Sequence, residues 1–148
     1  MLTRAFINIP FPDEERLTLM QLGGMIQFLD DLFDIWEDSN TNDVTLATST
    51  RNPQLLEDFY NEQLERLFSS CNTICKNRRN LHKFNAIALL LFVRGHVMLF
   101  QLQELVKQNR SFNIQSCSRE QLICDMATLR NNLKAMTMFI KHSRMIYA

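Results

Sequence analysis

Acidic side chains at helical spacing are the residues of this chain best suited to chemistry. Within residues 27–38, polar side chains fall on one half of a predicted helix and large apolar side chains fill the other half. Carboxylates three or four residues apart repel one another at a cost of about 0.2–0.5 kcal/mol for each pair. A divalent cation would turn that repulsion into binding energy, and Mg2+ commonly takes one or two carboxylates together with substrate phosphates. The polar residues are Gln27, Asp30, Asp31, Asp34, Glu37 and Asp38.

The surroundings of these acids leave two interpretations equally open, a metal site and a solvated helix surface. Gly23 and Gly24 precede the acids on the same side of the helix, although glycine costs about 1 kcal/mol relative to alanine in a helix interior. Their small size would leave room for a ligand. No lysine or arginine lies between Leu17 and Thr50, so the acids have no local salt-bridge partner. The alternative is an ordinary amphipathic surface helix, which also places acids opposite its apolar face.

Residues 22–34 resemble the second aspartate-rich motif of trans-prenyltransferases, which has the pattern G-x-x-F-Q-x-x-D-D-x-x-D. The overlapping Gln27, Asp34, Glu37 and Asp38 also resemble the Q-x-x-N-x-x-R-D-x-x-E-D pattern of squalene and phytoene synthases. Both groups belong to the class I isoprenoid synthase superfamily, an all-helical fold in which two acidic helices face each other across a cavity. The resemblance covers roughly residues 15–50.

This resemblance implies a role for each matching residue. Asp30, Asp31 and Asp34 would be catalytic, and Mg2+ would be the cofactor that drives departure of diphosphate from an allylic isoprenoid. Metal ligands would be Asp30, Asp34 and Asp38. The substrate would be a prenyl diphosphate, and the residues expected to lie near it are Gln27, Gly23 and Gly24.

Two departures from the family pattern change this expectation. Asp43 stands near the place where such families carry a basic residue, so substrate binding would depend on metal more than on protein cations. No second D-D-x-x-D or D-x-x-x-D motif occurs elsewhere in the chain. The chain therefore resembles the C-terminal half of such an enzyme. A separate chain carrying the first aspartate-rich motif, or a homo-oligomer in which two acidic faces meet, would have to complete it.

Length and composition predict a single all-α domain, a helical bundle over residues 1–148. Hydrophobic residues make up 46% of the 148 residues, and only three glycines and three prolines are available for turns. The balanced formal charge predicts no nonspecific nucleic-acid binding. We expect helices over residues 13–38, 53–76, 81–108 and 118–143, with Asn52-Pro53 starting the second and a capping box at residues 118–121 starting the fourth.

The remaining patterns favour structural roles. Residues 86–93 form the longest apolar run, which is too short to span a bilayer, so we expect no transmembrane segment and a cytoplasmic location. The four cysteines and three histidines lack the spacing of a zinc or di-iron site. Two basic clusters, within residues 76–83 and 141–144, would suit diphosphate or an anionic membrane surface, but we favour helix-dipole complementation for both.

Three functions are compatible with the sequence. The first is a catalytic component of a class I isoprenoid synthase that needs a second half. The second is a degenerate or non-catalytic partner subunit, and the third is a plain helical interaction module. In a chain that lacks half of its fold, the helices over residues 13–38 and 81–108 would leave apolar surface uncovered, so we expect self-association.

Overall fold

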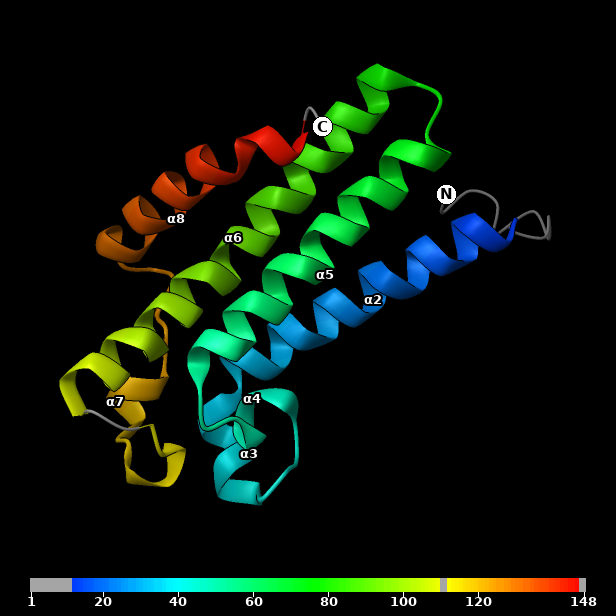
Figure 1. Cartoon of the computed structure of the whole chain (residues 1–148). Coiled ribbons are helices and arrows are strands. Elements are labelled where there is room, and N and C mark those ends of the chain that lie inside the picture. Colours follow the sequence, from blue (N-terminus) through cyan, green and yellow to red (C-terminus); the bar gives the residue numbers. More distant parts are fainter. Residues whose placement is uncertain (1–11, 110–111, 147–148) are drawn as a thin grey trace.

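The computed structural model describes residues 12–109 and 112–146, and these form an all-α bundle without strands, as predicted (Figure 1). Four long helices build the bundle: α2 (Asp13–Phe33), α5 (Pro53–Ile74), α6 (Arg78–Asn109) and α8 (Leu129–His142). The connections contain shorter helices: α3 (Ile35–Thr41), α4 (Leu46–Ser49), η1 (Ile114–Ser116), α7 (Arg119–Leu122) and η2 (Ser143–Ile146).

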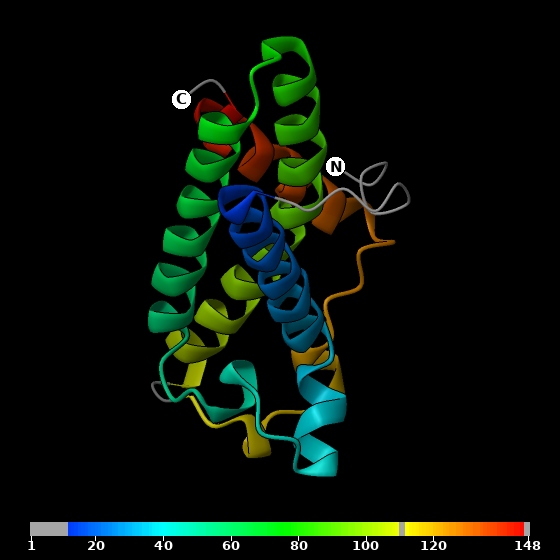
Figure 2. The ribbon, with the colours of Figure 1, turned by 90° about the vertical axis from the view of Figure 1, so that its right-hand side faces the viewer.

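Helices α5 and α6 form the centre of the bundle. α2 packs against both of them, whereas α8 packs along α6. Figures 1 and 2 together place α2 and α8 on opposite sides of the α5–α6 pair. Asn52 caps the start of α5 by accepting a hydrogen bond from the Gln54 amide at 3.0 Å, as the Asn-Pro pair predicts.

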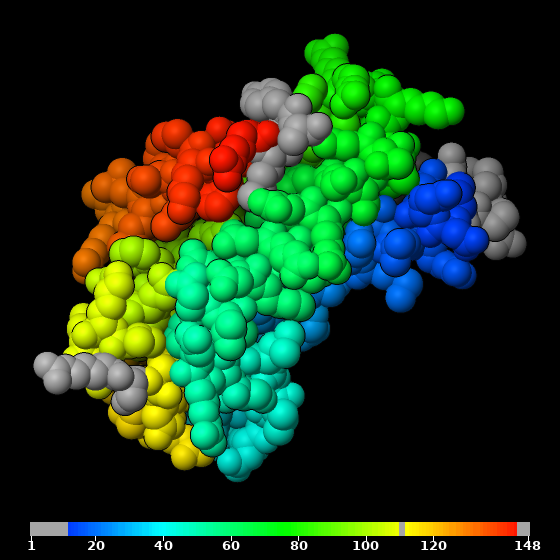
Figure 3. Space-filling model, in the orientation of Figure 1, coloured from blue at the N-terminus to red at the C-terminus, as the bar shows by residue number. Residues whose placement is uncertain are grey.

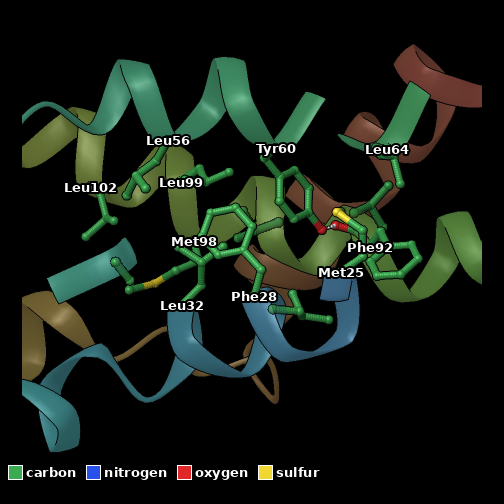
Figure 4. Close-up of a cluster of buried hydrophobic side chains, with 14 of the residues drawn as sticks. Met25, Phe28, Leu32, Leu56, Tyr60, Leu64, Phe92, Met98, Leu99 and Leu102 are labelled. Carbon is green, nitrogen blue, oxygen red and sulfur yellow. Dashed lines mark hydrogen bonds between the residues drawn. The ribbon is translucent and has the colours of Figure 1, made fainter. Parts of the chain in front are cut away.

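The core lies where α2, α5 and α6 meet (Figure 4). Tyr60 of α5 is fully buried there and donates its hydroxyl hydrogen to the Phe92 carbonyl of α6 at 2.7 Å. Gly95, one helical turn further along α6, makes this contact possible. A Cβ atom at Gly95 would lie only 2.5 Å from Tyr60 Oη and 3.1 Å from Leu29 Cδ1.

The first predicted helix, residues 13–38, is divided at Asp34. The backbone of Asp34 has φ −92° and ψ 8°, which ends α2 and begins α3. Hydrogen bonding continues through the break, since the Asp34 amide donates to Asp30 O at 2.9 Å and the Asp38 amide donates to Asp34 O at 2.8 Å. The break therefore bends the acidic segment without opening it into a loop.

The prediction of one helix over residues 118–143 is wrong. α7 ends at Leu122, and α8 begins at Leu129. Side chains satisfy the backbone groups in between: Asp125 Oδ1 accepts from the Ala127 amide at 2.8 Å, and Gln101 Nε2 donates to the carbonyls of Gln121 and Ile123 at 2.8 and 3.1 Å. These bonds replace the helical pattern.

Helix α6 is the one helix of the described residues that is long and apolar enough to cross a bilayer. Within its most apolar stretch, however, 61% of the residues are buried by the rest of the bundle. Core helices of soluble proteins have the same length and composition, so this feature is weak evidence for a membrane span.

Candidate functional site

Five carboxylates follow one another along α2 and α3 and are called the acid stripe below. None of them forms an ion pair with a described residue. Asp30 and Asp34 are exposed, whereas Asp31 and Asp38 are half-buried. The acid stripe consists of Asp30, Asp31, Asp34, Glu37 and Asp38.

The acid stripe is electrostatically unfavourable as it stands. Although Asp34 is largely exposed, its carboxyl loses some hydration to the surrounding protein, which raises its pKa, and repulsion from Asp30, Glu37 and Asp31 raises the pKa further. The pKa of Asp38 is also raised, first by partial burial and then by neighbouring carboxylates that include Asp43. The carboxylates therefore act on one another as a group, and a cation placed among them would relieve the repulsion.

Three of the predicted site residues line one pocket, the α2–α5 pocket, which has a volume of about 310 Å³. Gly24, Gln27 and Asp31 contribute to its wall from α2. Gln27 Nε2 donates to Asp31 Oδ1 at 2.8 Å, which fixes the orientation of that carboxylate. The other walls are mainly apolar and come from three helices. They are formed by Gln21, Met25, Phe28, Leu46, Phe59 and Gln63.

Asp30 lies in a different cavity, the α2–α6 groove, which has a volume of about 390 Å³. Ile26, Leu29 and Phe33 line it from α2, and Leu91 and Arg94 line it from α6. Asp30 and Asp31 face different cavities because successive residues of a helix point about 100° apart. The structure thus divides the predicted site residues between two cavities.

Asp30, Asp34 and Asp38 do not converge on one point. In the described residues, no group of three or more His, Cys, Asp and Glu side chains is arranged to hold a metal ion. A helix rises about 1.5 Å per residue, so acids spaced by four residues are separated by about 6 Å along the axis. Two neighbouring carboxylates are therefore the most that one ion could contact. That number suits Mg2+ when substrate phosphates complete its coordination, but not a cage made by protein alone.

The two glycines have free space beside them, as predicted. A methyl group added at Gly23 or Gly24 would meet no other heavy atom within 4 Å. Only Gly24 lines the α2–α5 pocket, however, and Gly23 does not line it.

Sequence reasoning missed the contributions from other helices. Phe59 and Gln63 of α5 close the α2–α5 pocket, and Arg94 of α6 brings a cation into the groove that contains Asp30. Phe59 and Gln63 are one helical turn apart, but nothing in their spacing indicates which helix they face.

A second feature that sequence did not predict is a stack of two buried histidines. The rings of His96 in α6 and His142 at the end of α8 lie 4.3 Å apart and nearly parallel. Burial lowers the pKa of His96 to about 3 and also lowers the pKa of His142. Both rings are therefore neutral near neutral pH, and they join the end of α8 to the core.

Comparisons with models of known protein families, with curated proteins and with solved structures find no match to this chain.

Proposed function

We propose that this chain binds the diphosphate group of an isoprenoid substrate through Mg2+, as one half of a site that a second acidic helix completes. The observation that supports this most is the acid stripe: five carboxylates that form no ion pair with a described residue, one of which, Asp30, lines a groove whose other walls are mainly apolar. The resemblance of residues 22–34 to an aspartate-rich motif supports the same substrate class.

Each group would have a defined part in binding. Asp30 and Asp34 would supply carboxylate oxygens to Mg2+, and Gln27 would keep the Asp31 carboxylate in place. In the α2–α6 groove beside Asp30, the side chains of Ile26, Phe33 and Leu91 would contact the hydrocarbon and keep water away from it. When bound, Mg2+ would neutralise negative charge that develops on the departing diphosphate. Because one acidic helix supplies few ligands, we expect the isolated chain to bind substrate without turning it over.

The test is calorimetric titration with farnesyl diphosphate and, separately, with inorganic diphosphate, each with and without Mg2+. We expect Mg2+ alone to bind weakly, diphosphate to bind only with Mg2+, and farnesyl diphosphate to bind more tightly because of its apolar chain. Asp30→Asn/Asp34→Asn should abolish binding of both ligands.

A matched control, Asp58→Asn/Glu65→Gln, removes the same charge from α5 and should leave binding intact. The proposal would be refuted by binding that does not need Mg2+, or by binding that survives in Asp30→Asn/Asp34→Asn.

A second candidate function is a helical partner subunit without a catalytic site. Exposed apolar side chains on two helices favour it: Leu17 and Met20 of α2 are 57% and 68% exposed, and Ile87 and Leu90 of α6 are 73% and 60% exposed. Large exposed apolar areas commonly mark association surfaces.

Analytical ultracentrifugation tests the second candidate. We expect the purified chain to self-associate, and Ile87→Gln/Leu90→Gln to reduce that association. A stable monomer at high concentration would refute the second candidate. If that monomer also bound diphosphate with Mg2+, the first proposal would be the one that remains.

A further inference from the structure

Helix α8 carries a ridge of apolar side chains that points away from the bundle. Spacing of four, three and four residues aligns them on one narrow line along the helix. Their exposed fractions range from 55% to 75%, so the described parts of the chain do not cover them. This α8 ridge consists of Leu129, Leu133, Met136 and Ile140.

The opposite face of α8 is attached to α6, so the ridge belongs to a fixed helix. His142 stacks on His96, and Met138 and Phe139 pack against the core cluster. At the start of the helix, Thr128 accepts a hydrogen bond from the Asn131 amide at 3.3 Å, and Asn131 Nδ2 donates to Asp125 O at 2.8 Å. Figure 3 shows α8, in orange to red, along the rim of the molecule.

All Lys, Arg, Asp and Glu residues within 129–144 are basic, and they lie beside the ridge. Lys134 extends over the Phe100 ring at 4.9 Å, and Arg130 and Lys134 line the cavity next to Leu133. Helix positions 130, 134 and 141 fall on one flank of the ridge, within about 40° of one another. The basic residues of this segment are Arg130, Lys134, Lys141 and Arg144.

This local charge is part of a division of the whole chain. Residues 1–65 contain thirteen acidic and three basic residues, whereas residues 66–148 contain three acidic and thirteen basic residues. The formal net charge of zero therefore conceals two strongly and oppositely charged parts. The acid stripe lies on α2 and α3, and α2 lies on the other side of the α5–α6 pair from α8 (Figures 1 and 2).

From these observations we infer that α8 binds flat on an anionic membrane surface. The α8 ridge enters the boundary between headgroups and acyl chains, while the basic side chains beside it contact lipid phosphates and carboxylates. A helix with an apolar line and a basic flank is typical of interfacial membrane binding. A planar surface accepts a convex ridge without a complementary groove, which a protein partner would need. The inference does not depend on the proposed diphosphate site.

The distribution of charge also fixes the orientation of the bound molecule. With α8 on the lipid, α2 and its carboxylates face away from the negative surface, where repulsion is least. The same distribution predicts that binding weakens as salt rises, because the attraction is screened.

The test is co-sedimentation with vesicles of phosphatidylcholine, with and without phosphatidylserine. We expect binding to the mixed vesicles, little binding to pure phosphatidylcholine, and loss of binding with added salt. Leu133→Ser/Ile140→Ser should remove binding, whereas Leu17→Ser/Met20→Ser, which alters equally exposed residues on α2, should not.

Charge variants test the electrostatic part separately. Each basic side chain near an anionic surface contributes about 1 kcal/mol to the free energy of membrane binding. Arg130→Gln/Lys141→Gln should therefore weaken binding about thirty-fold. Arg51→Gln/Arg119→Gln removes the same charge from other elements and should change binding little. If the two double variants lost vesicle binding equally, the assignment of lipid binding to α8 would be overturned.

A fluorescent reporter tests directly whether the α8 ridge enters the lipid. Met136→Trp in a Trp36→Phe background places the one tryptophan on the α8 ridge. Its emission should shift to shorter wavelength when phosphatidylserine vesicles are added. Unchanged emission, absence of binding to anionic vesicles, or capture of the chain only by an acidic protein would each overturn the inference.

Discussion

Replacing Gly95 with alanine should destabilise the protein, although alanine is the better helix former. The new methyl group would lie 2.5 Å from Tyr60 Oη and 2.7 Å from Tyr60 Cζ, well inside the usual separation of about 3.5–4.0 Å between carbon atoms. Tyr60 is fully buried and cannot move into solvent. We therefore expect α5 and α6 to separate slightly and the ring to shift, so that its hydroxyl also loses the Phe92 carbonyl.

The size of the effect follows from three contributions. Overpacking costs about 1–3 kcal/mol, and a buried hydroxyl without a partner costs about 1–3 kcal/mol. Higher helix propensity returns about 1 kcal/mol. The net loss is about 3 kcal/mol, which corresponds to a fall of roughly 10 °C in melting temperature for a domain of this size.

Urea unfolding monitored by circular dichroism measures this loss, and Gly24→Ala is the matched control. Gly24 also lies within a helix, but its added methyl group would meet nothing within 4 Å, so this variant should gain about 1 kcal/mol. Combining Gly95→Ala with Tyr60→Phe removes the closest contact and should cost less than the two single changes together. If Gly95→Ala were as stable as Gly24→Ala, the close packing of α5 on α6 would be refuted.

Three further predictions concern the acids, the histidines and the loop before α8. Asp34→Asn should raise the free energy of unfolding by about 0.2–0.5 kcal/mol for each relieved carboxylate pair, measured in metal-free urea titrations; a decrease would contradict mutual repulsion. The native pKa values of His96 and His142 lie below the unfolded value of 6.5, so their stabilising contribution is complete above about pH 6.5. The contribution of His96 is lost as pH falls toward about 3, by at most about 1.4 kcal/mol per pH unit, and that of His142 is lost as pH falls below 6.5; His142→Phe should reduce this dependence in urea midpoints measured across pH. Gln101→Leu should free two carbonyls and speed amide hydrogen exchange over residues 119–123, whereas unchanged exchange would show that other contacts hold α7.

Much of the fold could be predicted because helix signals here are local. The Asn52-Pro53 start of α5 and the capping box of Ser118 with Gln121 both occur in the structure. The break after α7 could not be predicted, since residues 123–128 contain no glycine or proline. It depends on Gln101, which is distant in sequence and reaches the carbonyls of residues 121 and 123.

The candidate site was predictable only in part. Periodicity correctly placed Asp30 and Asp31 outside the core on α2, and the exposed Asp34 follows at the junction of α2 and α3. It could not show that α5 and α6 approach from two directions and separate Asp30 from Asp31. The net charge of the whole chain also concealed the separation of an acidic part, residues 1–65, from a basic part, residues 66–148. Equal numbers of acidic and basic residues cancel in that sum.

That division gives the molecule a large electric dipole, with consequences for how copies of it meet. The acidic part of one molecule attracts the basic part of the next. Such head-to-tail contacts can add molecules without limit unless the assembly closes into a ring. At neutral pH the net charge is near zero, so little overall repulsion keeps such chains apart. We expect low ionic strength to favour such head-to-tail assembly and moderate salt to prevent it, since the Debye length falls to about 8 Å at 0.15 M.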